Sequence, residues 1–299
     1  MKAVRLQSFG DVDQFRLEEA PDPVPGAGEV LVGVAYAGLN PVDLYVRQGG
    51  FARIDMEMPA ILGIDAAGTV EAVGDGVTGY KVGDRVAVHA PLKGRGTYAE
   101  RVVAPVAGLA HLPDSVDFQA GAALPLVGLT GRQLVDKLGG VKAGDRVLVS
   151  GALGGVGRAA VQYLKELGAV PVAGVRAERL DEGRALAGEA LDIGAGGEPS
   201  FDYAVSAAGP VGAQLMTLVR DGGSVAAAIP VPEEAKAGRQ VRVEVIMAHD
   251  DAATLQAVVD AVARGNLGIP VERVFPLAEL AEAHRALAAH PRGKILIEV

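Results

Sequence analysis

The chain has 299 residues, of which 49% are hydrophobic and 22% charged, so it is long enough for two globular domains with a sizeable core. Its formal net charge is −9 and no segment is rich in lysine and arginine, which argues against a nucleic-acid-binding surface. The absence of cysteine excludes disulfides, thiolate nucleophiles and zinc sites built on cysteine.

The N-terminal residues 1–6 enter strand-like alternation at once and lack the long apolar core of a signal peptide. No apolar stretch reaches membrane-spanning length. We therefore expect a cytoplasmic protein that does not bind a membrane.

Short β-rich runs broken by glycine, proline and aspartate follow one another as far as Leu112. The predicted strands cover residues 2–6, 14–18, 30–36, 68–73, 85–89 and 99–103. Frequent turns between such runs are typical of an all-β domain.

From about residue 117 to residue 260 the pattern changes to alternating strands and helices. The predicted strands are residues 147–149, 170–175, 203–206 and 224–229, with helices such as 158–167 and 212–219 between them. This alternation predicts a doubly wound parallel sheet, so the fold class is α/β. The last forty residues return to a mixed pattern, with a strand at 271–275, a helix at 277–289 and a strand at 294–299.

A glycine-dense turn joins the strand at 147–149 to the helix that follows it. It contains Ala152-x-Gly154-x-x-Gly157, in which alanine replaces the first glycine of the usual dinucleotide fingerprint. Glycines let the backbone approach a pyrophosphate, and the free N–H groups of the helix point toward it. Because a second strand follows the helix, we predict a dinucleotide site; the alternative is a strand-to-helix turn without a ligand.

The end of the second predicted strand favours NADPH over NADH. An NAD site usually has Asp or Glu here, whereas this chain has Arg176, followed by Glu178 and Arg179. A guanidinium binds phosphate oxygens in a bidentate manner, so Arg176 and Arg179 suit a 2′-phosphate. In the alternative interpretation both arginines are solvated surface charges and Glu178 binds the ribose.

Several further motifs occur in the order found in one family. They are Gly38-Leu39-Asn40-Pro41-Val42-Asp43, Pro59-Ala60-Ile61-Leu62-Gly63-Ile64-Asp65-Ala66-Ala67-Gly68-Thr69-Val70, Val82-Gly83-Asp84-Arg85-Val86, Gly96-Thr97-Tyr98-Ala99-Glu100, Gly128-Leu129-Thr130, Ala283-His284-Arg285-Ala286-Leu287 and Arg292-Gly293-Lys294-Ile295. With these motifs and the glycine turn, the chain resembles the zinc-independent quinone oxidoreductases of the medium-chain dehydrogenase/reductase superfamily.

The resemblance implies a GroES-like β-barrel domain and a Rossmann domain. The GroES-like domain, which carries the substrate and catalytic residues, is expected over residues 1–117 and is completed by residues 265–299. The Rossmann domain, which binds NADP(H), is expected over residues 118–264. The resemblance also implies a homodimer formed by pairing of Rossmann sheet edges.

The resemblance further implies chemistry without zinc. The zinc-dependent alcohol dehydrogenases of the same superfamily need a thiolate where this chain has Asn40 and an imidazole where it has Ile64. Without a Lewis acid, the expected reaction is hydride transfer from NADPH to an electrophilic small molecule, a quinone or an α,β-unsaturated carbonyl. The alternatives are a 2-enoyl thioester reductase and a non-catalytic NADPH-binding protein.

The family pattern places Asn40, Asp43 and Tyr45 at the catalytic cleft, where the amide of Asn40 and the hydroxyl of Tyr45 are expected to donate hydrogen bonds. In the alternative interpretation Asn40 and Asp43 cap the short helix after Pro41, and Tyr45 is a half-buried packing residue. Asp65 is expected to hold a loop through hydrogen bonds.

The same transfer assigns cofactor contacts to residues of the predicted Rossmann domain. They are Thr130, Gly154, Gly155 and Val156 at the phosphates and nicotinamide end, Arg176 and Arg179 at the 2′-phosphate, and Ser206, Ala207, Ala228 and Ile229 at the carboxyl ends of two strands.

Overall fold

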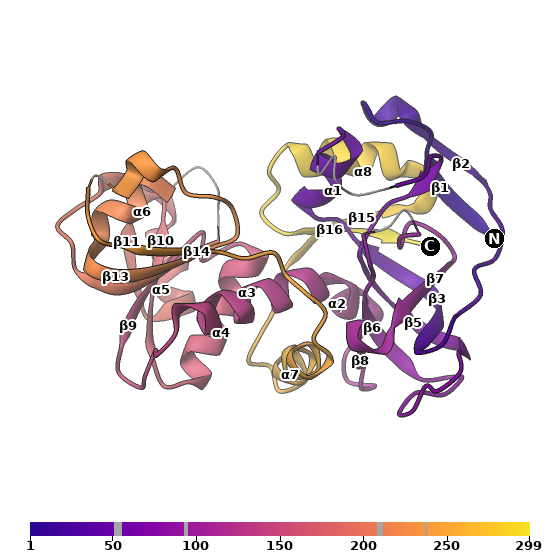
Figure 1. Cartoon of the computed structure of the whole chain (residues 1–299), viewed down its shortest axis with the longest axis horizontal. Coiled ribbons are helices and arrows are strands. Elements are labelled where there is room, and N and C mark those ends of the chain that lie inside the picture. The colour runs from indigo at the N-terminus through magenta and orange to yellow at the C-terminus, as the bar shows by residue number, and fades with distance from the viewer. Residues whose placement is uncertain (51–55, 93–94, 208–211, 237) are drawn as a thin grey trace. The chain divides into compact units, whose positions relative to one another are not determined.

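The computed structural model describes residues 1–50, 56–92, 95–207, 212–236 and 238–299. Its contacts divide the chain into two compact units, residues 1–126 with 250–299 and residues 127–249. Figure 1 shows that the C-terminal elements β15, α8 and β16 belong to the same unit as the N-terminal strands. The first unit is therefore built from both ends of the chain.

The main sheet of the first unit joins N-terminal and C-terminal strands. In spatial order its strands are β15 (Val271–Pro276), β16 (Lys294–Glu298), β3 (Glu29–Gly38), β5 (Asp65–Val73), β6 (Arg85–His89) and β8 (Leu109–His111), with β7 (Arg101–Pro105) also paired to β3. All these pairs are antiparallel except β15 with β16. A smaller antiparallel sheet contains β2 (Phe15–Glu19), β1 (Lys2–Leu6) and β4 (Ala60–Ile61).

Alternation along the strands positions the core of this unit. In β3, Val30 and Val32 are fully buried, whereas their neighbour Leu31 is half-buried. Successive side chains of a strand point to opposite faces, so the alternation read from the sequence becomes one core-facing side. The predicted β-rich character of this segment is confirmed.

Helices and short 3₁₀ turns close the first unit. They are η1 (Val12–Gln14), α1 (Pro41–Arg47), η2 (Val106–Gly108), α2 (Phe118–Ala123), α7 (Ala252–Ala263), η7 (Leu277–Glu279) and α8 (Leu280–Ala288). α2 packs on β3 and β5, and α7 packs on β8. The residues of both helices fall within 118–264, the range expected for the Rossmann domain, whereas the compact units divide at 126/127 and 249/250.

The packing of α2 and α7 explains this difference. A Cβ on Gly121 would lie 2.8 Å from Leu112 and 3.0 Å from Ala67, so the small residues of α2 allow it to approach the strands closely. α7 buries Leu255, Val258 and Val259 on its inner face. Periodicity alone does not reveal which sheet an apolar helix face will cover.

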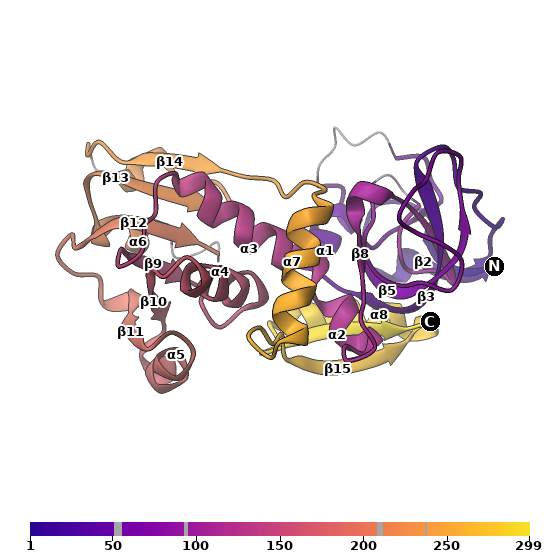
Figure 2. The same ribbon diagram turned by 90° about the horizontal axis from the view of Figure 1, so that it is seen from below.

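The second unit has one parallel sheet with the strand order of a dinucleotide-binding fold. In space the strands follow one another as β11 (Glu189–Asp192), β10 (Val170–Val175), β9 (Arg146–Ser150), β12 (Phe201–Ser206), β13 (Val219–Ala227) and β14 (Arg242–Val245). Every neighbouring pair is parallel, and Figure 2 shows the sheet running from β14 to β11. In chain order this is 3-2-1-4-5-6, the doubly wound Rossmann arrangement, and it confirms the predicted fold class.

Helices surround this sheet. They are α3 (Pro125–Leu138), α4 (Gly155–Glu166), α5 (Leu180–Ala187) and α6 (Gly212–Leu218), with the 3₁₀ turns η3 (Ala177–Arg179), η4 (Ile193–Ala195) and η6 (Glu233–Lys236). The sequence pattern located the four inner strands but missed the edge strands β11 and β14, which are short and only partly buried. Within the described residues, no helix is both long enough and apolar enough to span a membrane.

Candidate functional site

The turn between β9 and α4 has the geometry expected of a phosphate-binding loop. Gly151 adopts a φ of 71°, a left-handed conformation that favours glycine and provides the tight turn one residue before Ala152. A Cβ on Gly157 would lie 2.2 Å from the carbonyl oxygen of Gly151 and 2.6 Å from Cα of Ala152. Because both neighbours are backbone atoms, helix α4 can pack this closely on the turn only with glycine at position 157. The alanine in the fingerprint is therefore accommodated, since Gly151 makes the turn.

Hydrogen-bond donors are available at the start of α4. Gly154 precedes the helix as its N-cap, so the N–H groups of Gly155, Val156 and Gly157 have no acceptor within their own helix. The buried hydroxyl of Ser150, at the end of β9, has no hydrogen-bond partner among the described residues. These donors at the start of α4 fit a pyrophosphate.

Helix α3 packs directly against this turn. A Cβ on Gly131 would lie 2.6 Å from both Cβ of Ala159 and the carbonyl oxygen of Val156. Thr130, the neighbour of Gly131, is 7% exposed. The structure thus brings the helix that carries Thr130 against the first turn of α4.

The other predicted contact residues follow neighbouring strands at the same edge of the sheet. Ser150 and Ser206 are paired in register, and the N–H of Ala207 donates to the carbonyl of Ser150 at 3.1 Å. The N–H of Ala228 donates to the carbonyl of Ser206 at 3.0 Å. Ser206 is buried, whereas Ile229 is 52% exposed. The carboxyl ends of β9, β12 and β13 therefore lie side by side, as a dinucleotide site requires.

Arginines lie after β10, where the sequence predicted a 2′-phosphate site. The side chain of Arg176 is 76% exposed, and its Nε lies 3.4 Å from a carboxylate oxygen of Glu178. Arg179 donates two hydrogen bonds to Glu182, at 3.0 and 2.7 Å. Both arginines thus have carboxylate neighbours, but the contact between Arg176 and Glu178 is long and both of its side chains are exposed to solvent.

The sequence analysis missed a third arginine of this group. Arg158 follows Gly157 in α4, and its Nε donates to the carbonyl of Leu153 at 3.1 Å. Burial and, second, the nearby charge of Arg179 lower the pKa of Arg158. Its place in the first turn after the glycine fingerprint was the signal that could have identified it.

A second polar site lies inside the first unit, and we call Asn40, Asp43, Asp65, Tyr98 and Lys294 the buried polar cluster. The first four are fully buried, and Lys294 is 8% exposed. Strand pairing assembles the cluster: Gly38, the last residue of β3, is paired with Asp65 of β5 and with Leu296 of β16. Asn40, two residues later, therefore lies between the start of β5 and the start of β16.

Both ends of the Asn40 amide have partners. Its Nδ2 donates to Oδ2 of Asp65 at 2.9 Å, and its Oδ1 accepts a hydrogen bond from Nζ of Lys294. Nζ of Lys294 also lies 3.2 Å from Oδ2 of Asp65. The other oxygen of Asp65 accepts from the N–H of Leu126 at 2.8 Å, so this hydrogen bond holds the start of helix α3 where a loop contact was expected.

Asp43 and Tyr98 extend the cluster. Oδ2 of Asp43 accepts from the backbone N–H of Asn40 and from the hydroxyl of Tyr98, both at 2.8 Å. Burial raises the pKa of Asp43 to about 7, although these two hydrogen bonds oppose the shift. Burial, followed by the charge of Asp43, raises the pKa of Tyr98 well above its usual value. Asp43 therefore changes protonation state near neutral pH.

The predicted catalytic residues divide into two groups. The structure brings Asn40 and Asp43 together, and Asp43 caps the start of α1 through the N–H of Asn40. Tyr45 is 54% exposed, and its ring lies over Gly50. Lys294 and Tyr98 were given no role from sequence, although both lie in quoted motifs.

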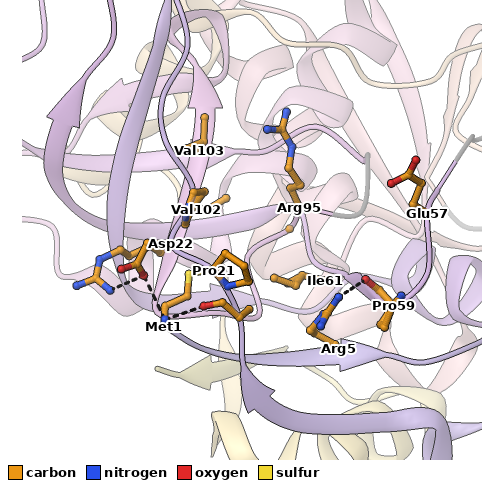
Figure 3. A pocket seen from close by; sticks show the side chains of 14 residues that line it. Met1, Arg5, Pro21, Asp22, Glu57, Pro59, Ile61, Arg95, Val102 and Val103 are labelled. Atoms are coloured by element: carbon orange, nitrogen blue, oxygen red, sulfur yellow. Dashed lines mark hydrogen bonds and ion pairs between the residues drawn. The ribbon is translucent and has the colours of Figure 1, made fainter.

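A separate cavity of about 600 Å³ lies in the first unit. Figure 3 shows Arg5 directed at the carbonyl of Pro59, and Asp22 beside Met1. A carboxylate oxygen of Asp22 lies 3.2 Å from the N-terminal amine and 3.2 Å from a guanidinium nitrogen of Arg101. Arg5 is also paired with Glu18 at 2.9 Å. None of the predicted site residues lines this cavity.

Comparisons with known proteins agree with this architecture. One family model, the alcohol dehydrogenase GroES-like domain, matches residues 26–114, and another, described as zinc-binding dehydrogenase, matches residues 181–297. The chain is similar in structure to the quinone oxidoreductase of Pseudomonas syringae pv. Tomato, with a TM-score of 0.84, 30% identity, and coverage of 100% of this chain and 99% of that chain. The chain belongs to the quinone oxidoreductase family of the medium-chain dehydrogenase/reductase superfamily. The resemblance drawn from the sequence motifs is confirmed.

Other members of the family support the same placement. The quinone oxidoreductase of Coxiella burnetii has a TM-score of 0.88 at 28% identity, covering 100% of this chain and 99% of that chain. The human quinone oxidoreductase is 38% identical over 169 residues, which are 56% of this chain and 50% of the human protein. The chain spans about half the length of the curated relatives it matches.

Proposed function

We propose that the protein is an NADPH-dependent oxidoreductase that transfers hydride to a quinone or an α,β-unsaturated carbonyl without a metal. One observation carries this proposal. The second unit combines the glycine turn, the N–H groups at the start of α4 and the arginines 158, 176 and 179 beside its parallel sheet. Membership of the quinone oxidoreductase family supports the reaction class.

The residues of this edge fit NADPH. The N–H groups of Gly155, Val156 and Gly157, which have no acceptor within their own helix, would hold the pyrophosphate together with the hydroxyl of Ser150, which has no partner among the described residues. Arg176 would bind the 2′-phosphate, since its exposed guanidinium is only loosely paired with Glu178. When bound, NADPH supplies a hydride from C4 of its nicotinamide.

The buried polar cluster supports chemistry without a metal. The ammonium of Lys294 contacts both Asn40 and Asp65, so a divalent cation at these side chains would meet a positive charge at hydrogen-bonding distance. In the ranges that the structure describes, no group of three or more histidine or acidic residues is placed to hold a metal ion.

The proposal is tested by following the consumption of NADPH and of NADH with benzoquinone, phenanthrenequinone, a 2-alkenal and crotonyl-CoA as separate acceptors. Turnover of a quinone or alkenal with NADPH supports the proposal. Faster turnover of crotonyl-CoA would favour a thioester reductase, and tight NADPH binding without any turnover would indicate a binding protein.

The cofactor preference is tested with Arg176→Ala. We expect the KM for NADPH to rise by about 10- to 100-fold, because the 2′-phosphate loses one or two charge-assisted hydrogen bonds. The KM for NADH should change little. Arg184→Ala is the matched control, because Arg184 is an exposed arginine paired with Asp181 on the next helix. An equal rise for both nucleotides would contradict the assignment of Arg176.

A further inference from the structure

Lys294 is held in the buried polar cluster by two acceptors. Its Nζ donates to Oδ1 of Asn40 and lies 3.2 Å from Oδ2 of Asp65. An ammonium has three N–H donors, and among the described residues no third acceptor contacts it. The side chain of Lys294 is 7% exposed, whereas that of Asp65 is fully buried. Lys294 thus has one N–H donor without an acceptor among the described residues, and it is the least buried member of the cluster.

The position of this ammonium is set in advance by the surrounding backbone. Asp65 is itself fixed by the N–H of Leu126 at 2.8 Å and by Nδ2 of Asn40 at 2.9 Å. Gly38 leaves space beside the pair, since a Cβ there would lie 3.4 Å from Cε of Lys294 and 3.1 Å from Cβ of Asp65. The charge is therefore held by groups that need no rearrangement during a reaction, which is the condition for effective electrostatic catalysis.

The proposed reaction requires such a donor. When a hydride adds to a conjugated acceptor, its electron pair forms the new C–H bond, and the π electrons of the acceptor shift to the carbonyl oxygen. The product of this step is an enolate or a hydroquinone anion. A proton from water then completes the product. Hydrogen-bond donors that meet the developing oxyanion lower the barrier to the first step.

We propose, building on the proposed function, that Lys294 is a catalytic residue whose third N–H donates to the acceptor oxygen as it gains negative charge. Asp65 and Asn40 hold the ammonium in place. In this arrangement a side chain of the chain itself supplies the positive charge for the reaction.

Lys294 could instead serve only to neutralise the charge of Asp65. A double-mutant cycle separates this structural role from the catalytic one. Lys294→Met leaves a buried carboxylate unpaired, so we expect its Tm to fall by roughly 10 °C. In Asp65→Asn/Lys294→Met both charges are absent. The new amide can accept from Leu126 and donate to a reoriented Asn40, so we expect most of the Tm to return.

Turnover gives the decisive comparison. We expect kcat of the double variant to stay about 100-fold or more below that of Asp65→Asn alone, which is the effect of losing an oxyanion donor. NADPH binding should be retained in both variants. Lys137→Met, at an exposed lysine of α3, controls for the loss of a positive charge. If the double variant recovers both Tm and kcat, Lys294 only neutralises Asp65 and the proposal is overturned. An inactive wild-type protein would instead overturn the proposed function, and this role with it.

Discussion

Asp43→Asn tests whether the fold holds a buried carboxyl group that titrates near neutral pH. Both hydrogen bonds to Asp43 end on Oδ2, where an amide oxygen accepts them equally well, and Oδ1 is buried without a partner among the described residues. The amide has nearly the shape of the protonated acid. The substitution therefore removes the titration and changes little else.

The expected magnitude follows from the shift in pKa. Asp43 has a pKa of about 7 in the folded protein and 3.8 in the unfolded chain. Between these values the folded state binds more protons, so the free energy of unfolding falls as pH rises and becomes constant above pH 7. One pKa unit corresponds to about 1.4 kcal/mol. The ionisation of Asp43 therefore lowers the free energy of unfolding of the wild-type protein by about 4 kcal/mol between pH 4 and pH 7. In Asp43→Asn this loss is absent.

The assay is thermal unfolding of both proteins at a series of pH values from 4 to 8. We expect similar Tm values near pH 4 and a Tm for Asp43→Asn that is higher by roughly 10 °C near pH 8. Asp114→Asn, at a fully exposed aspartate, controls for the change in net charge. A Tm difference between Asp43→Asn and wild type that does not vary with pH would show that burial does not control the protonation of Asp43.

Three further predictions concern single contacts. Gly157→Ala should cost about 1–3 kcal/mol and abolish nucleotide binding, measured by fluorescence titration, because its Cβ meets backbone at 2.2 Å; Gly154→Ala, with its nearest atom at 3.4 Å, should cost less. His284 is buried with no hydrogen-bond partner in the described part of the chain, and burial lowers its pKa to about 3, so His284→Leu should gain stability relative to wild type as pH falls from 6.5 to 3. An equal response of both proteins to acid would contradict this. Asp117→Ala removes the cap on the N–H of Ala120 and should cost about 1 kcal/mol in denaturant unfolding, whereas no loss would show that α2 is stabilised by packing alone.

The sequence was most informative where a local pattern has one structural solution. The run at 147–149, the glycines at 154 and 157 and the strand at 170–175 predicted a strand, turn and helix, and the structure has β9, α4 and β10 there. Gly157 is required by a contact only six residues away in the chain. Short, partly buried strands such as β11 and β14 were missed because few of their residues alternate clearly.

The candidate site was only partly predictable. Asn40 and Asp43, which the sequence placed on one segment, lie in one hydrogen-bonded cluster because they are three residues apart at the start of a helix. Lys294 and Tyr98 received no role, since their contacts with Asn40 and Asp43 span 254 and 55 residues. A lysine at the start of a C-terminal strand has no local signal that it will be buried.

The sequence by itself determined the fold class, the family and the glycine turn between β9 and α4, because these depend on periodicity and on glycines that act within a few residues. Tertiary structure decided the boundaries of the compact units and the membership of the buried polar cluster. β3 pairs with β5 on one side and with β16 on the other, and only this pairing places Asp65 and Lys294 against Asn40. Desolvation then sets the charge state of Asp43, and desolvation exists only after the chain has closed over it.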